Sequence, residues 1–312
     1  MDYLVAENNV EETTAEVATL PERISIDSKT DSSAMPYALI SMLVTLAITF
    51  VLIFVVWRRH KGKFSFVLGG IATYFVFFLI GGPKIADLIL GFMPEAVYSN
   101  NGVKILIGGL VTAGFALLGR YMVLRLYQSR LTKLADSTSI GIGLMTMEAA
   151  VCIVNYFSYV VFYSALNSSG WQSFIDKEIT QNMLDTYVKM YEYEPAMHFA
   201  ILAWTVIMLL VHLLASVPMY AAYKDKISKG WYAICFGFIF VLQCAYYGYV
   251  VGAINVGAWI GMGVATLGFF GYLCMRIYLK YYAKEAFSHI RESEEQEKKE
   301  NKLPRFSNLS KL

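Results

Sequence analysis

The chain has 312 residues, of which 57% are apolar or aromatic and 16% are charged, and its mean hydropathy is +0.49. Soluble globular domains average about 45–50% apolar and about 25% charged residues, so this composition argues against a water-soluble enzyme. The net charge of +2 gives no reason to expect a nucleic-acid partner. The apolar residues form long blocks instead of short alternating segments, which predicts an all-α, polytopic transmembrane bundle and not a membrane β-barrel.

The chain is expected to begin with an acidic tail. Residues 1–36 are polar, lack the basic start and the cleavage site of a signal peptide, and can bury little apolar surface. We therefore expect a mostly disordered extracytoplasmic tail over 1–36, the helical bundle over 37–282, and a charged cytoplasmic tail over 283–312. The acidic residues of the first segment are Glu7, Glu11, Glu12, Glu16, Glu22, Asp27 and Asp31.

Seven transmembrane helices are predicted, each about as long as the roughly 20 residues that cross a bilayer. Lys and Arg near their ends set the orientation, and nineteen lie on one side against six on the other. This bias places the N-terminus outside and the C-terminus in the cytoplasm. We expect a multi-pass protein of a bacterial plasma membrane, with the lipid bilayer as its first partner. The predicted spans are 37–57, 65–82, 103–125, 139–166, 197–223, 230–251 and 256–279.

Two segments on the outer side have the apolar spacing of interfacial helices. In 83–94 and in 171–190 the apolar residues recur at i, i+3, i+4 and i+7, which is typical of a helix lying in the membrane surface. Such helices either cover the end of the bundle or bind a substrate.

Ionisable residues inside the spans are the main functional candidates, because each costs about 2.5–3.5 kcal/mol to insert. These are Arg120, Glu148 and His212, with Asn155 and Gln243 as uncharged companions. At about 1.5 Å of rise per residue, Arg120, Glu148, His212 and Gln243 all lie in the inner half of the membrane. An Arg120–Glu148 ion pair is expected, and it could serve structure alone, with His212 bonded to a backbone carbonyl, or form part of a functional site.

Small residues inside the spans have a packing interpretation. The four cysteines lie in apolar blocks without metal-ligand spacing, so we interpret them as small buried hydrophobes. Gly141 and Gly143, and the face of Gly257, Gly261 and Ala265, would let helices approach closely. The last face could pack within one chain or between two, so the oligomeric state stays open.

Two motifs carry a resemblance to a known family. Residues 115–121 read FALLGRY and residues 139–150 read SIGIGLMTMEAA. They resemble the motifs Phe-Glu-Glu-x-Gly-Arg-Tyr and Gly-x-Gly-His-Gly-Gly-x-Glu-Ala of the YhfC family of intramembrane peptidases, which are distant relatives of CAAX-processing and bacteriocin-processing proteases. The resemblance covers about 38–280 and implies the family's helical fold. It retains Arg120, Tyr121, Glu148 and, on a later helix, His212.

The positions that carry chemistry in that family are replaced. Ala116 and Leu117 stand where the family has paired glutamates, Leu144 stands where it has a histidine, and the later His-x-x-x-Asp element falls on Gln243 and Tyr247. Alanine and leucine can neither accept a proton nor bind a hard cation. A divalent site needs about three protein ligands, and Glu148 and His212 alone are too few, so no cofactor is expected. A zinc-like ion is expected only if the chain is an active enzyme.

Three functions remain open. The first is a pseudo-peptidase that acts as a scaffold or accessory and binds a membrane protein segment or a peptide, with Arg120, Tyr121, Glu148, Asn155, His212 and Gln243 as its candidate binding residues. The second is an active intramembrane peptidase in which Glu148 is the base, His212 the acid or ligand, and Arg120 orients Glu148. The third is a small-solute transporter, for which the sequence has neither an internal repeat nor broken helices.

Overall fold

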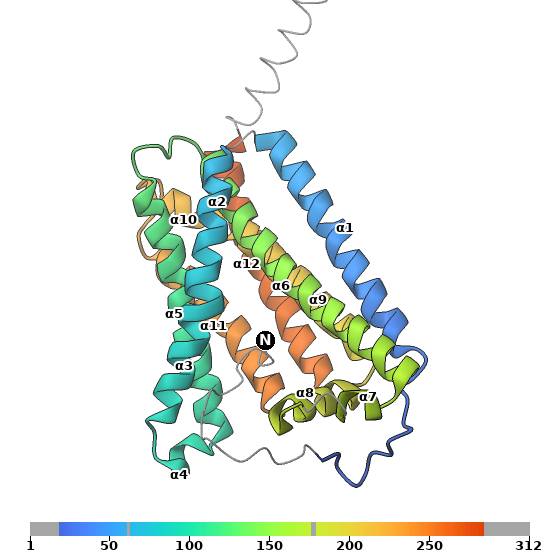
Figure 1. The fold of residues 1–312 in the computed structure, drawn as a ribbon. Coiled ribbons are helices and arrows are strands. Elements are labelled where there is room, and N and C mark those ends of the chain that lie inside the picture. Colours follow the sequence, from blue (N-terminus) through green and yellow to red (C-terminus); the bar gives the residue numbers. More distant parts are fainter. Residues whose placement is uncertain (1–18, 61–62, 176–178, 284–312) are drawn as a thin grey trace, which may run out of the picture. The chain divides into compact units, whose positions relative to one another are not determined.

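The computed structural model describes residues 19–60, 63–175 and 179–283. Helices alone make up the regular structure of these residues, which confirms the all-α class, and seven helical runs are long and apolar enough to cross a membrane (Figure 1). The boundaries agree with the prediction to within a few residues except in the second span. The seven runs are Ala34–Val56, Phe64–Gly91, Asn101–Leu126, Leu134–Ser169, Met197–Tyr223, Trp231–Val250 and Val256–Tyr281.

The chain folds into two compact units that share three long helices. Of the described residues, one unit comprises 19–53, 145–175 and 179–209, and the other comprises 54–60, 63–144 and 210–283. The unit boundaries fall within α1 (Ala34–His60), α6 (Leu134–Ser169) and α9 (Met197–Leu214). We call the first the outer-cap unit, because the Lys and Arg bias predicts that its short helices lie on the outer side, and the second the arginine unit, because it contains Arg120.

The second span is longer than predicted because its helix widens at a proline and continues. It consists of α2 (Phe64–Thr73), the π-helical segment η2 (Tyr74–Gly81) and α3 (Gly82–Gly91). Pro83 has no N–H, and its ring would clash with a carbonyl one α-turn earlier. The π-helical turn, in which the amide of Gly82 donates to the carbonyl of Phe77, accommodates this residue. The segment 83–94, predicted as a separate interfacial helix, is therefore largely part of the span.

Close helix contacts hold the arginine unit together. α5 (Asn101–Leu126) packs on α11 (Trp231–Val250), where a Cβ at Gly108 would lie 2.7 Å from the ring of Tyr247. The predicted close approach at the start of α6 is also confirmed, because Gly143 lies against the backbone of α2 and Gly141 against the turn that joins α9 to α10 (Ser216–Tyr223). By contrast, nothing lies within 4 Å of a Cβ at Gly261 on α12 (Val256–Tyr281), so that face of small residues makes no close helix contact within the described chain.

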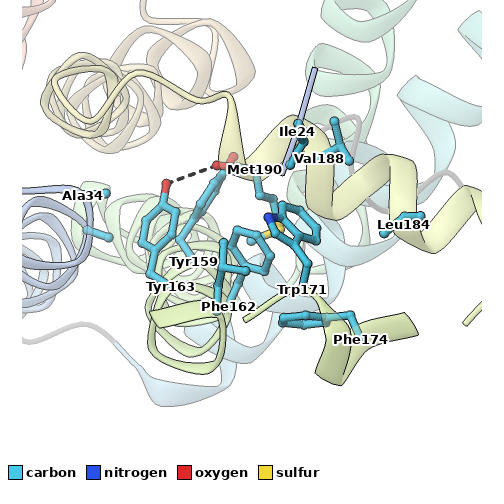
Figure 2. Packing of buried hydrophobic residues seen from close by; sticks show 12 residues of the cluster. Ile24, Ala34, Tyr159, Phe162, Tyr163, Trp171, Phe174, Leu184, Val188 and Met190 are labelled. Carbon is cyan, nitrogen blue, oxygen red and sulfur yellow. Dashed lines mark hydrogen bonds between the residues drawn. The ribbon is translucent and has the colours of Figure 1, made fainter. Parts of the chain in front are cut away.

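An aromatic cluster forms the core of the outer-cap unit (Figure 2). Trp171, which is fully buried, packs against Phe162 and Phe174, with ring centroids 6.0 Å apart in both pairs. The rest of the cluster comes from the start of α1, the end of α6 and two short helices, α7 (Gln172–Ile175) and α8 (Gln181–Tyr191). Most of the apolar pattern of 171–190 thus faces this core, whereas Met183 is exposed. The remaining described helix is α4 (Glu95–Tyr98).

Residues 19–33, which we call the N-terminal strap, are tied to the same cap. Ile24 is buried in the aromatic cluster, and the amide of Trp171 donates to the carbonyl of Ile26 at 3.3 Å. Arg23 forms an ion pair with Glu192 at 2.6 Å, and the hydroxyl of Thr30 donates to Asn167 at 3.0 Å. This part of the tail, predicted as mostly disordered from its composition, is therefore held by specific contacts. Residues 1–18 and 284–312 of the predicted tails lie outside the described residues.

Candidate functional site

A buried arginine–histidine pair is the centre of the candidate site in the arginine unit. Nη2 of Arg120, on α5, lies 2.6 Å from Nδ1 of His212, near the end of α9. Arg120 is 4% exposed and His212 is fully buried. A guanidinium can only donate hydrogen bonds, so Nδ1 of His212 is the acceptor and the imidazole is neutral, with its proton on Nε2. The sequence suggested a backbone carbonyl as the partner of His212, and Nδ1 instead binds Arg120.

Two aromatic rings from the π-helical segment cover this pair. The guanidinium carbon of Arg120 lies 5.3 Å from the ring centroid of Phe78, and the rings of Phe78 and Tyr74 meet the His212 ring edge-to-face at 5.3 and 5.9 Å. Tyr74 and Phe78, four residues apart, stack on each other at 5.3 Å. A desolvated cation–π contact stabilises a buried cation by about 2 kcal/mol. The rings and the imidazole thus provide a favourable environment for a charge inside an apolar bundle.

The other candidates in this unit are Tyr121 and Gln243. Tyr121 follows Arg120 but points away, since the residue is 38% exposed and its ring meets that of Tyr232 edge-to-face at 5.8 Å. Gln243, on α11, is half-buried, and its convergence with Arg120 and His212 stays a prediction. The structure therefore brings together two of the four predicted residues of this unit.

Glu148 and Asn155 belong to the outer-cap unit, where both are half-buried on α6. The expected Arg120–Glu148 ion pair would join the two units, so it stays a prediction, as does the convergence of Glu148 with His212 and Gln243. On the same face of α6, the Cys152 thiol accepts a hydrogen bond from the hydroxyl of Thr205 at 3.3 Å. All four cysteines are free thiols, and Cys235 and Cys274 are buried as expected.

The positions at which the sequence departs from the YhfC motifs are largely enclosed. Ala116 is fully buried, Leu144 is 1% exposed and Leu117 is half-buried. Tyr247 packs on Gly108, and its hydroxyl lies 3.3 Å from that of Thr112, so it joins two helices. Among the described residues, no group of three or more His, Cys, Asp or Glu side chains is placed to hold a metal ion.

A second buried histidine, which the sequence did not single out as a candidate, lies in the outer-cap unit. Nε2 of His198, at the start of α9, is 3.2 Å from the hydroxyl of Tyr163. The rings of Tyr156, Tyr159, Tyr163 and Tyr193 surround the imidazole, with centroids 4.9–6.0 Å away. The signal that could have revealed it is the spacing of three tyrosines at 156, 159 and 163, which share one face of α6.

Charged groups outside the spans stabilise the N-terminal strap. The hydrogen bond and the negative charge of Glu192 raise the pKa of the exposed Arg23. Hydrogen bonds from the hydroxyl and the amide of Ser33, at 2.6 and 2.7 Å, lower the pKa of Asp31. Both shifts favour the charged forms, so the strap keeps these contacts near neutral pH.

No protein-family model, no curated protein and no solved structure matches the chain. The seven helices that are long and apolar enough to cross a membrane make the chain a multi-pass integral membrane protein.

Proposed function

We propose that the chain is a non-catalytic relative of the YhfC intramembrane peptidases, which acts in a bacterial plasma membrane as a scaffold or accessory protein. In this proposal its partner is a membrane segment or a peptide of another protein. The observation that supports the proposal most directly is the set of contacts that Arg120 makes. Its guanidinium is bound to His212 and covered by Phe78, which is an arrangement that stabilises helix packing.

The residues around the motif support the same proposal. The first-motif position Ala116 and the second-motif position Leu144 are apolar and buried, so neither contributes a base or a metal ligand. Nδ1 of His212 already accepts a hydrogen bond from Arg120, so its lone pair is not available to bind a metal ion or to take up a proton as a base. A helical framework with this interior can recognise a partner helix by packing, which needs no catalytic group.

Photo-crosslinking in intact membranes tests the proposal. A diazirine analogue of leucine would replace Leu117, which occupies one of the two positions of the missing glutamates. The same analogue at Leu279, which is 58% exposed on α12, serves as the matched control. We expect position 117 to link to a discrete membrane protein that co-purifies with the chain when both are expressed together, and position 279 to link only to lipid.

Two outcomes would overturn the scaffold function. If position 117 links only to lipid or within the chain, no partner segment reaches this part of α5. If it links to a protein that the chain cleaves, and the cleavage is lost in Glu148→Gln, the peptidase alternative is correct.

A further inference from the structure

The outer-cap unit binds the N-terminal strap largely through the backbone of the strap. The side-chain amide of Gln181, on α8, accepts a hydrogen bond from the amide of Thr19 at 3.0 Å and donates one to its carbonyl at 3.4 Å. Asp185, one turn further along α8, accepts a hydrogen bond from the same side chain at 2.8 Å and thereby orients it. Both bonds to Thr19 use main-chain atoms, so they do not depend on the side chain at this position.

Two more contacts of this kind lie farther along the strap. The chain turns after α6 at Gly170, which has a positive φ of 65°, and the next amide, that of Trp171, donates to the carbonyl of Ile26 at 3.3 Å. The side chain of Asn167 accepts from both the amide and the hydroxyl of Thr30, at 3.1 and 3.0 Å. Peptide-recognition domains gain affinity from main-chain hydrogen bonds, and specificity from pockets for particular side chains.

Two adjacent strap residues supply such specificity. Nε of Arg23 forms the ion pair with Oε1 of Glu192 at 2.6 Å. Ile24 is 7% exposed and belongs to the aromatic cluster (Figure 2), and Leu20, four residues earlier, packs against the same cluster. The surface under the strap is therefore complementary to a segment in which an aliphatic residue directly follows an arginine and a second aliphatic residue lies four positions before the first.

The strap is held loosely enough to be replaced. Ile24 is the one residue of 19–33 that is buried. The side chains of Arg23 and Glu192 are 65% and 41% exposed, and an exposed ion pair of this kind adds little stability. A segment with few buried apolar contacts can open while the helices around it stay folded. A peptide that offers the same groups can then take the place of the strap.

We propose that the surface under the strap is a peptide-binding site, which we call the strap site. Its polar residues are Asn167, Trp171, Gln181 and Glu192, and its apolar position is the one that Ile24 fills. The strap occupies the site when no partner is bound, and a segment of a partner protein, with an aliphatic residue directly after an arginine, replaces it. This inference rests on the proposed function for the existence of a partner, and it adds where the partner binds and which side chains are selected.

Fluorescence anisotropy with a labelled peptide of residues 19–30 tests the strap site on the full chain in nanodiscs. In the open-strap variant, Arg23→Gln with Ile24→Asn, the chain's own strap loses both selected side chains. We expect this variant to bind the peptide at least about tenfold more tightly than wild type, because the tethered wild-type strap competes at an effective concentration in the millimolar range. A peptide that carries the same two substitutions should bind the open-strap variant at least about tenfold more weakly.

Charge reversal shows whether the peptide binds at the strap site. Glu192→Arg in the open-strap variant should weaken binding of the wild-type peptide and strengthen binding of a peptide with Arg23→Glu, because the ion pair then forms in the opposite sense. Glu194→Arg is the matched control. This glutamate is exposed and lies two residues away, so the wild-type peptide should remain the tighter binder in that variant.

Three results would overturn the proposal. They are binding to the open-strap variant that is no tighter than to wild type, a reversal of preference in Glu194→Arg as well as in Glu192→Arg, and a wild-type dimer that the peptide dissociates, which would make the strap of a second copy the ligand. If the open-strap variant fails to fold, hydrogen exchange of wild type decides the question. Excess peptide should speed exchange of the chain's own Thr30 amide, and unchanged exchange contradicts the strap site.

The strap site and the scaffold function fail separately. The peptide stands in for the partner segment, so its binding is measured without any partner protein. Absence of binding removes the strap site alone, whereas crosslinking at position 117 decides the scaffold function.

Discussion

Replacing His212 by phenylalanine is predicted to destabilise the protein by about 2–3 kcal/mol. The substitution keeps a flat ring of similar size, so the edge-to-face contacts with Tyr74 and Phe78 can persist. It removes Nδ1, which accepts from Nη2 of Arg120 at 2.6 Å. A hydrogen bond to a charged group is worth about 1.5–3 kcal/mol, and the buried donor that loses its acceptor adds to the cost.

A second substitution separates the loss of this bond from a simple packing defect. In the double variant Arg120→Met with His212→Phe, the buried guanidinium is gone as well, so no donor loses its acceptor in the pair. Apolar replacement of a whole buried polar pair is often neutral or stabilising, while removal of one member is costly. We therefore expect the double variant to be more stable than His212→Phe alone by about 1 kcal/mol or more.

Thermal unfolding in nanodiscs is the assay for both variants. A loss of this size lowers the melting temperature by roughly 5–10 °C in a protein of a few hundred residues. Tyr121→Phe is the matched control, because this neighbour of Arg120 faces away from the pair, and its melting temperature should not change. The reasoning is refuted if His212→Phe melts at the same temperature as wild type, or if the double variant is no more stable than His212→Phe alone.

Two further predictions concern other parts of the chain. Gly108→Ala should cost about 1–3 kcal/mol in thermal unfolding, because its Cβ would lie 2.7 Å from the Tyr247 ring, whereas Gly114→Ala on the same helix meets nothing within 4 Å and should be neutral. Acidification below about pH 4 should lower the hydrogen-exchange protection factor of the Ser33 amide. The pKa of Asp31 is lowered in the folded chain, so the stabilisation by its carboxylate is complete above the unfolded pKa and is lost as pH falls through the folded pKa. In Asp31→Asn the protection factor of this amide should no longer change over this pH range, and a pH dependence like that of wild type would count against the role of this carboxylate.

The apolar blocks of the sequence predicted the number and type of the membrane helices because a bilayer imposes a length of about 20 residues on each. They could not predict that the second span continues through Pro83. The extension depends on a π-helical turn, whose hydrogen bond from Gly82 to Phe77 leaves no periodic trace in the sequence. A proline in a helical pattern is normally interpreted as the end of the helix. Here the helix continues, and the proline follows a segment with wider, π-helical turns.

The candidate site was predictable only in part. The free-energy cost of placing ionisable residues inside the membrane identified Arg120 and His212 as residues that need partners, and the structure pairs them directly. The insertion cost could not identify Phe78 and Tyr74 as part of the site, because aromatic residues in a span are ordinarily packing residues. The N-terminal strap was missed for a related reason: its composition is polar, and it is held by a few contacts, such as Arg23 with Glu192, that join residues far apart in the sequence.

Hydrolysis is the measurement that tests the central claim of a non-catalytic protein most directly. Wild type and Glu148→Gln would be compared in nanodiscs on a panel of labelled single-span peptides, with zinc added and with a chelator. The account predicts the same background rate for both proteins under both conditions. Cleavage by wild type that falls by about a hundredfold or more in Glu148→Gln would contradict it, because that is the contribution of a working general base.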